Sequence, residues 1–104
     1  MPSRHQVNAK VHERRTCVAL GGTRNGPNPG SDCIGTPYSV ECKRQAKLSL
    51  RADHLAQARR QSAVDGKPWL LVQQEHGSDS PVVTMDFKWF VDVLHPLYLA
   101  SLDA

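Results

Sequence analysis

No apolar run in this chain approaches the roughly 20 residues that span a bilayer, and nothing resembles a secretory signal. Internal repeats and low-complexity segments are also missing. The three cysteines are odd in number and form no Cys-x-x-Cys pair. From these absences we expect a reduced, intracellular protein in the cytoplasm, with no membrane partner.

The sequence also lacks a recognisable metal-binding grouping of cysteine and histidine. His12, Cys17, Cys33 and Cys42 could supply four zinc ligands, but they do not have the ligand spacing of zinc sites. Buried thiols are the better interpretation, because Cys42 falls on the core side of a predicted strand. The five histidines form no HExxH motif. His12 and His54 are candidates for DNA contact, with ordinary surface positions as the alternative.

Charge is distributed unevenly along the chain. The formal net charge is +3, but residues 1–60 carry eleven Lys/Arg against four Asp/Glu, and residues 61–104 carry two against six. A basic half beside an acidic half indicates a polyanionic partner on one face, and nucleic acid is the common case. The alternative is a basic surface that is simply solvated.

The first half of the chain is predicted to fold into one helix and two strands. Gly21-Gly22 ends the helix, and Gly35-Thr36-Pro37 supplies the turn of a hairpin between the strands. The predicted elements are an irregular start (1–7), a helix (8–20), a loop rich in Gly, Pro and Asn (24–31) and two strands (32–34 and 38–43).

The second half is predicted to alternate helix, two strands and helix. The predicted elements are a helix ended near Gly66 (52–64), a strand buried on both faces (68–74), a strand placed at an edge by its proline (81–85) and a helix capped by Asp86 that Pro96 ends or kinks near His95. The order α-β-β-α-β-β-α predicts one α/β domain over 1–104, with a mixed sheet and flanking helices.

The apolar residues of the two predicted helices in the second half have different roles. In the 52–64 helix, a thin apolar face packs on the sheet, and its members are Ala52, Leu55, Ala56 and Ala63. In the last helix, the spacing that faces a core belongs to Phe87, Phe90, Val91 and Leu94. The other apolar residues of this helix lie on its remaining faces. They are either scattered surface residues or part of a dimer contact: Trp89, Val93, Leu97 and Leu102.

Three charged residues around the first hairpin form the candidate site. Side chains alternate along a strand, so Glu41 and Lys43 project from one face, and the hairpin brings Asp32 beside Glu41. Two carboxylates and an ammonium group at one point suit a hard divalent cation and a phosphate. The alternative is a surface ion pair between Glu41 and Lys43, with Asp32 capping a turn.

These residues, in their structural context, match a family pattern. A first-helix Glu13, then Asp32, then Glu41-x-Lys43 in a strand, then a helix with Gln57, resembles the PD-(D/E)xK nuclease superfamily. The short length and the order of elements look like the archaeal-type Holliday junction resolvases and related phage nucleases. The resemblance covers roughly residues 8–94. It includes an arginine, Arg24, ahead of the loop, and it departs from the pattern at Ser31, where the superfamily name implies a proline.

The resemblance implies a restriction-endonuclease-like core and a set of site residues. Mg²⁺, for which Mn²⁺ can substitute, would be held by Asp32, Glu41 and the backbone carbonyl of Cys42, with Glu13 completing the metal site. Lys43 would orient or deprotonate the attacking water or stabilise charge on the phosphorane, and the second helix would present Gln57 to the site. The alternatives are a Glu13 that pairs with Arg14 or Arg15 on the helix surface, and an exposed Gln57.

The activity implied by the resemblance is cleavage of branched DNA, most simply Holliday junction resolution by a homodimer, in DNA recombination and repair. The rival interpretations are a replication-repair or nicking nuclease with the same core, and a non-catalytic DNA-binding module. The candidate phosphate-binding residues flank the site in sequence and are Arg14, Arg15, Arg24, Arg44, Lys47, Arg51, Arg59 and Arg60.

Overall fold

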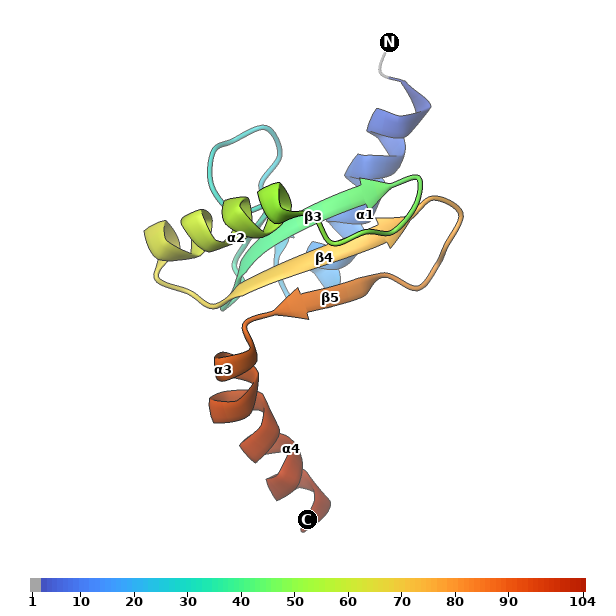
Figure 1. Ribbon diagram of the computed structural model, residues 1–104. Coiled ribbons are helices and arrows are strands. Elements are labelled where there is room, and N and C mark those ends of the chain that lie inside the picture. The colour runs from blue at the N-terminus through green and yellow to red at the C-terminus, as the bar shows by residue number, and fades with distance from the viewer. Residues whose placement is uncertain (1–2) are drawn as a thin grey trace.

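The computed structural model describes residues 3–104 and contains a three-stranded mixed sheet at its centre (Figure 1). The sheet order is β3 (Ser39–Gln45), β4 (Trp69–Glu75) and β5 (Val82–Met85). β3 and β4 run parallel and are connected through the helix α2 (Ala52–Asp65), whereas β5 runs antiparallel to β4. The expected α/β fold with a mixed sheet and helices is therefore confirmed.

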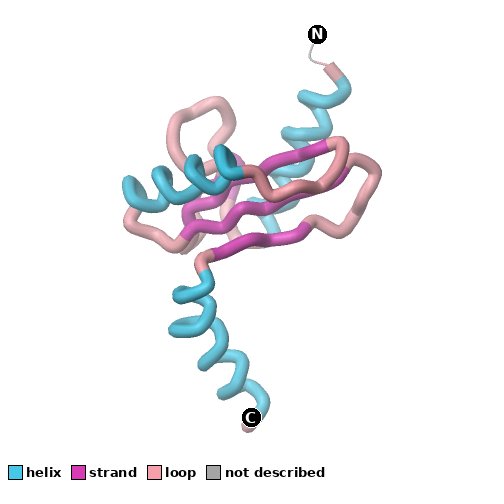
Figure 2. Tube along the Cα trace, in the orientation of Figure 1, coloured by secondary structure: helices cyan, strands magenta, loops and turns pink. Residues whose placement is uncertain are grey.

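Helices cover the two faces of the sheet, with α1 (Arg4–Ala19) on one side and α2 on the other (Figure 2). The alternation of side chains along β3 and β4 divides the core accordingly. On the α2 side the buried residues are Ala58, Trp69 and Leu71. On the α1 side they are Cys17, Cys33, Val40, Cys42, Leu70 and Val72. The strand predicted to be buried on both faces is thus confirmed as β4.

Residues next to the helix ends set the C-terminus of α2 and the N-terminus of α1. Gly66 follows α2 in the left-handed conformation with φ 67°, as the predicted glycine stop requires. In contrast, α1 begins at Arg4, because Ser3 and Gln6 form a capping box. The expected irregular start is therefore wrong for Arg4–Val7, and Met1 and Pro2 lie outside the described residues.

The apolar face predicted for α2 needs correction. Ala58 is fully buried against the sheet and Leu55 packs beside it, whereas Ala52 and Ala63 are exposed. The small Ala58 side chain lets the helix approach Trp69 and Leu71 closely.

The hairpin predicted for residues 32–43 is replaced by a different pairing. β2 (Cys33–Ile34) pairs antiparallel with β1 (Thr23–Arg24), a strand within the predicted loop region. The residue before β2 is hydrogen-bonded to β3 instead: the Asp32 N–H donates to the Val40 carbonyl at 2.8 Å. Gly22 allows the segment before β1 to lie close to β2, since a Cβ at that position would lie 2.2 Å from the Ile34 carbonyl oxygen.

Two of the three cysteines are joined by a disulfide, Cys17–Cys33, with a Cα–Cα distance of 5.3 Å. The expectation of three reduced thiols is therefore wrong for this pair, and the pairing also removes the four-ligand zinc alternative. Cys42 is a free, buried thiol, as expected. Disulfides are rare in cytosolic proteins, so this bond speaks against the expected cytoplasmic location, which stays a prediction.

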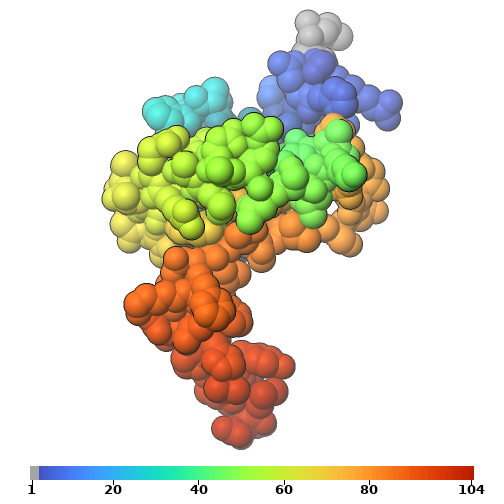
Figure 3. All heavy atoms as spheres, in the orientation of Figure 1, coloured from blue at the N-terminus to red at the C-terminus, as the bar shows by residue number. Residues whose placement is uncertain are grey.

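The chain ends in a continuous helical segment that projects away from the sheet (Figures 1 and 3). It comprises α3 (Phe87–Trp89), the π-helical η1 (Phe90–Leu94) and α4 (His95–Leu102). Pro96 was expected to end or kink the helix near His95. The helix does not end there, because Pro96 falls in the first turn of α4, directly after the π-helical interruption of the regular hydrogen-bond ladder.

The face of this last helix that was expected to point into the core is also wrong. Phe87, Phe90 and Val91 are exposed, and the helix touches the core through Trp89, which packs edge-on against Tyr38 with ring centroids 6.0 Å apart. Within residues 3–104, no helix combines the length and apolarity needed to cross a membrane.

The disulfide gives the first testable prediction. Replacing Cys17 and Cys33 together by serine should lower the stability by about 3 kcal/mol, because a closed loop of 16 residues restricts the unfolded chain. For a chain of this size we expect a loss in Tm of about 10 °C or more in thermal unfolding. Reductant should lower the wild-type Tm by the same amount and leave the double variant unchanged; a wild-type Tm that ignores reductant would contradict the bond.

Candidate active site

The three charged residues singled out in the sequence converge beside β3. Asp32 lies just before β2, and its Oδ2 accepts a hydrogen bond from the Cys42 N–H at 2.7 Å. This bond fixes the Asp32 carboxylate against the free edge of β3, between the positions of Glu41 and Lys43. The bonding scheme differs from the predicted hairpin, but it brings the same side chains together.

Gln57 joins the two site residues of β3. From α2, its Nε2 donates to Glu41 Oε2 at 3.2 Å, and its Oε1 accepts from Lys43 Nζ at 2.8 Å. Gln57 is therefore not an exposed helix side chain, and Glu41 and Lys43 are not a surface ion pair: Glu41 is only 3% exposed. The amide holds the carboxylate and the ammonium group in fixed positions on one face of the sheet.

Burial and nearby acidic groups raise the pKa of both carboxyl groups. Burial, followed by the nearby Asp32 charge, raises the pKa of Glu41 to about 7, and Lys43 offsets this only in part. The pKa of Asp32 is also raised, chiefly by burial, although the Cys42 N–H, Lys43 and Arg24 oppose the shift. Two buried acids with incomplete compensation form a site that a cation would stabilise.

Glu13 is near this pair but has its own partner. Its Oε2 accepts from Arg24 Nε at 2.7 Å in a half-buried ion pair between α1 and β1. Neither Arg14 nor Arg15, the partners considered from the sequence, takes this place. Glu13 contributes to the raised pKa of both Asp32 and Glu41, so it lies close enough to act on the site electrostatically.

The backbone of Cys42 adds a further oxygen. In an extended strand the N–H and C=O of one residue point to the same side. Because the Cys42 N–H points to Asp32, its carbonyl also faces away from β4 and toward the site.

The donor set fits magnesium better than zinc or calcium. Within residues 3–104 there is no group of three or more His, Cys, Asp or Glu side chains placed to hold a metal ion. Mg²⁺ needs fewer protein ligands, because it binds through one or two carboxylates and keeps several waters. Asp32, Glu41 and the Cys42 carbonyl are the hard oxygen groups that could hold such an ion.

Comparison of the chain with protein-family models, with curated proteins and with solved structures finds no match. The function of the site must therefore be argued from its own geometry.

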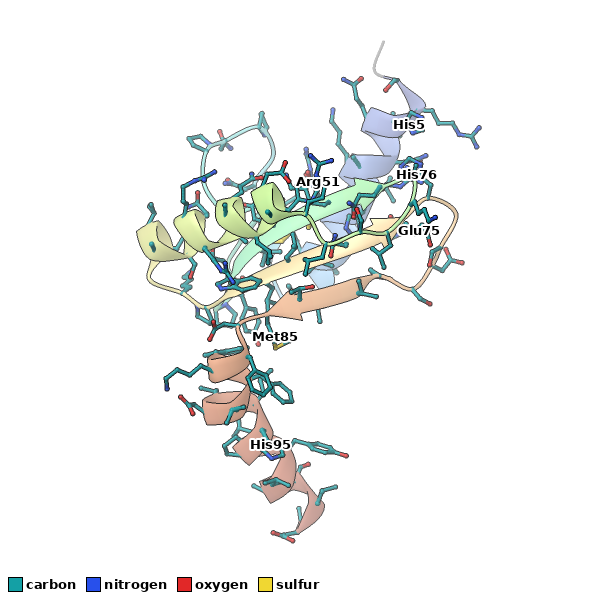
Figure 4. All side chains as sticks on the ribbon, viewed as in Figure 1. His5, Arg51, Glu75, His76, Met85 and His95 are labelled. Atoms are coloured by element: carbon teal, nitrogen blue, oxygen red, sulfur yellow. A yellow bond between two sulfur atoms is a disulfide. The ribbon has the colours of Figure 1, made fainter. Side chains whose placement is uncertain are left out.

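The basic residues proposed for DNA contact occupy different environments. Arg24 is held by Glu13, the Arg51 Nε donates to exposed Asp53 at 2.9 Å, and Arg59 lies over the Trp69 ring at 5.8 Å from its centroid. Figure 4 shows Arg51 beside the start of α2. Arg44 is half-buried, and the remaining candidates are exposed: Arg14, Arg15, Lys47 and Arg60.

Of two further neighbours of the site, Asp65 was missed from the sequence, and His54 was considered there only for contact with DNA. Asp65 accepts from Ser39 Oγ at 2.8 Å and contributes to the raised pKa of Glu41. His54 precedes Gln57 by three residues on α2, and its Nδ1 is buried with no hydrogen-bond partner among residues 3–104. Burial and the Lys43 charge lower the pKa of His54. The helical i, i+3 spacing with Gln57 was the available signal.

Glu41 makes the stability of the metal-free protein depend on pH. Its pKa rises from about 4.5 to about 7 on folding, so the folded state binds more protons than the unfolded state within that window. The contribution of Glu41 to stability is therefore fully present below pH 4.5 and is lost as the pH rises through 7. After solvent screening we expect a loss of about 1–3 kcal/mol.

The measurement is thermal unfolding of wild type and Glu41→Gln in EDTA from pH 4.5 to 8. The neutral amide cannot ionise, so the Tm of the variant should rise relative to wild type with increasing pH. Parallel Tm profiles for the two proteins would show that Glu41 does not titrate as described.

Proposed function

We propose that this protein is a Mg²⁺-dependent endonuclease that hydrolyses phosphodiester bonds in branched DNA, with four-way junctions as the preferred substrate. The observation that carries the proposal is the bonded set Glu41–Gln57–Lys43 with Asp32 held beside it. A surface ion pair would not be buried or bridged by a residue from another element.

The chemistry follows from the residue types in the site. Asp32, Glu41 and the Cys42 carbonyl would hold Mg²⁺, or Mn²⁺ in its place, and the bound cation would neutralise charge at the scissile phosphate and activate water. Lys43 uses one donor on Gln57, which leaves N–H donors for a phosphate oxygen or the attacking water. Glu13 and Arg24 would act on this set electrostatically rather than by direct ligation.

The substrate assignment rests on charge and on the resemblance to junction resolvases. Exposed basic residues from α1, the β3–α2 connection and α2 would contact phosphates, which give affinity without sequence information. A homodimer would present two such sites to two strands of a four-way junction. Recombination and repair of bacterial or phage DNA would be the corresponding process.

The test is cleavage of a labelled four-way junction with and without Mg²⁺. Asp32→Asn and Lys43→Met should each reduce the cleavage rate by at least ~10²-fold, while junction binding in EDTA survives. The matched controls are Asp103→Asn and Lys88→Gln, which alter exposed residues of the C-terminal helical segment and should cleave normally.

Other substrates distinguish the rival functions. Cleavage of flaps or nicking of duplexes, without junction cleavage, would favour a replication-repair or nicking nuclease. Wild type that binds DNA regardless of EDTA and leaves every substrate intact in Mg²⁺ and Mn²⁺ would overturn the enzyme and favour a binding module.

A further prediction concerns Gln57 as a positioning residue. Gln57→Leu removes both bonds that hold Glu41 and Lys43, so kcat should fall about tenfold or more with little change in KM for the junction. Gln61→Leu is the matched control one turn later in α2, where the amide bonds Asp65 instead. Equal kcat values for the two variants would show that Gln57 does not position the site.

A further inference from the structure

An open apolar groove lies on the α1 face of the sheet. It has a volume of about 540 Å³ and runs between α1 and the strands β4 and β5. Alternate residues of β5, including Val83 and Met85, face it, and Trp89 and Leu94 close one end. Figure 4 shows Met85 at the point where the sheet gives way to the C-terminal helical segment. Trp89 and Leu94 of the C-terminal helical segment thus reach one end of this face, and the rest of the groove near β5 is open, with Val83 49% exposed.

The apolar surface that such a groove would take is present in the same chain. We call residues 87–102 the C-terminal arm; it extends from the body of the molecule (Figure 3). Phe87 is 77% exposed, and Leu97 and Tyr98 are 64% and 63% exposed. The only charged side chains of the arm are Lys88 and Asp92, which pair with each other.

The arm is too apolar to be stable in water by itself. A helix that is apolar around most of its circumference is normally buried. A helix that lies on a membrane surface carries a face rich in Lys and Arg, whereas the arm has one lysine. A protein surface is therefore the better partner for the arm.

Beyond Trp89 and Leu94, the arm is directed away from its own groove (Figure 1). Only Asp86 separates β5 from α3, and its Oδ2 accepts from the Trp89 N–H at 3.0 Å while its carbonyl accepts from the Phe90 N–H. These bonds fix the direction in which the helix leaves the sheet. A short, rigid connection of this kind favours exchange of a segment between two copies.

The areas agree with an exchanged dimer. Phe87 and Tyr98 alone leave ~200–350 Å² exposed, since an aromatic side chain offers about 150–250 Å². Leu97, Leu99 and Leu102 add to this, so the exposed apolar area of the arm is comparable with the largest patches of monomers, ~300–600 Å², which are often functional. A reciprocal exchange buries both an arm and a groove on each copy, so the area buried per copy grows toward the ~800 Å² per partner of a stable interface.

We propose that two copies of this chain form a two-fold dimer in which the arm of each copy lies in the groove of the other. The contact is closed, because each copy offers the same two surfaces. This dimer specifies the homodimer that the proposed function includes and rests on that proposal. Its test measures molecular mass rather than DNA cleavage. A monomeric nuclease and a dimer without activity are therefore distinguishable results.

The experiment is light scattering on size-exclusion fractions of the full chain at about 100 μM. Wild type should show twice the 11.5 kDa chain mass. Leu97→Asp on the arm and Val83→Asp in the groove should each return it to the monomer mass. The arm control is Val64→Asp, an exposed apolar position on α2 that should remain dimeric.

The groove variant has a control on its own strand. Val82 and Val83 are 43% and 49% exposed, but Val82 faces the opposite side of the sheet and does not line the groove. Val82→Asp should therefore stay dimeric while Val83→Asp does not, with circular dichroism showing that both are folded. Monomeric wild type overturns the proposal, as does a folded Val83→Asp that remains dimeric, because the arms would then pair with each other. If Val83→Asp is unfolded, Leu97→Asp decides, since its side chain projects from the arm.

Discussion

The hydrogen bond from the Cys42 amide to the Asp32 carboxylate is the interaction on which the rest of the site depends. Glu41 and Lys43 are placed by strand alternation alone, but Asp32 comes from a loop and has no such constraint. A charged acceptor on a backbone donor makes a strong and directional bond. Without it, the free edge of β3 would hold one carboxylate, and no pair of acids would face a cation.

Much of the chain between α1 and β3 serves to keep that bond in place. The Cys17–Cys33 disulfide ties the residue after Asp32 to α1, and the Arg24–Glu13 ion pair ties β1 to the same helix. Gly22 allows the two short strands to approach, because any side chain there would meet the Ile34 carbonyl. The segment has little regular structure, so covalent and ionic contacts replace the ladder that a long hairpin would supply.

Local patterns in the sequence were sufficient for some features and not for others. The period of two places Glu41 and Lys43 on one face, and Gly66 ends α2, because both depend on neighbouring residues only. The disulfide and the β1–β2 pairing depend on which distant segments meet, and no spacing encodes that. The arm was misassigned because the pattern of Phe87 and Phe90 shows that a face needs burial without showing which molecule or surface provides it.

The same arrangement that suits a cation costs stability when none is bound. Glu41 is 3% exposed beside another carboxylate, and burial and this neighbour raise its pKa to about 7. An apolar residue there would make a more stable sheet, since a buried acid gains nothing from the core. Gln57 and Lys43 offset part of the cost and at the same time orient the groups toward a ligand. A buried set of charges with this cost is expected to serve binding or chemistry.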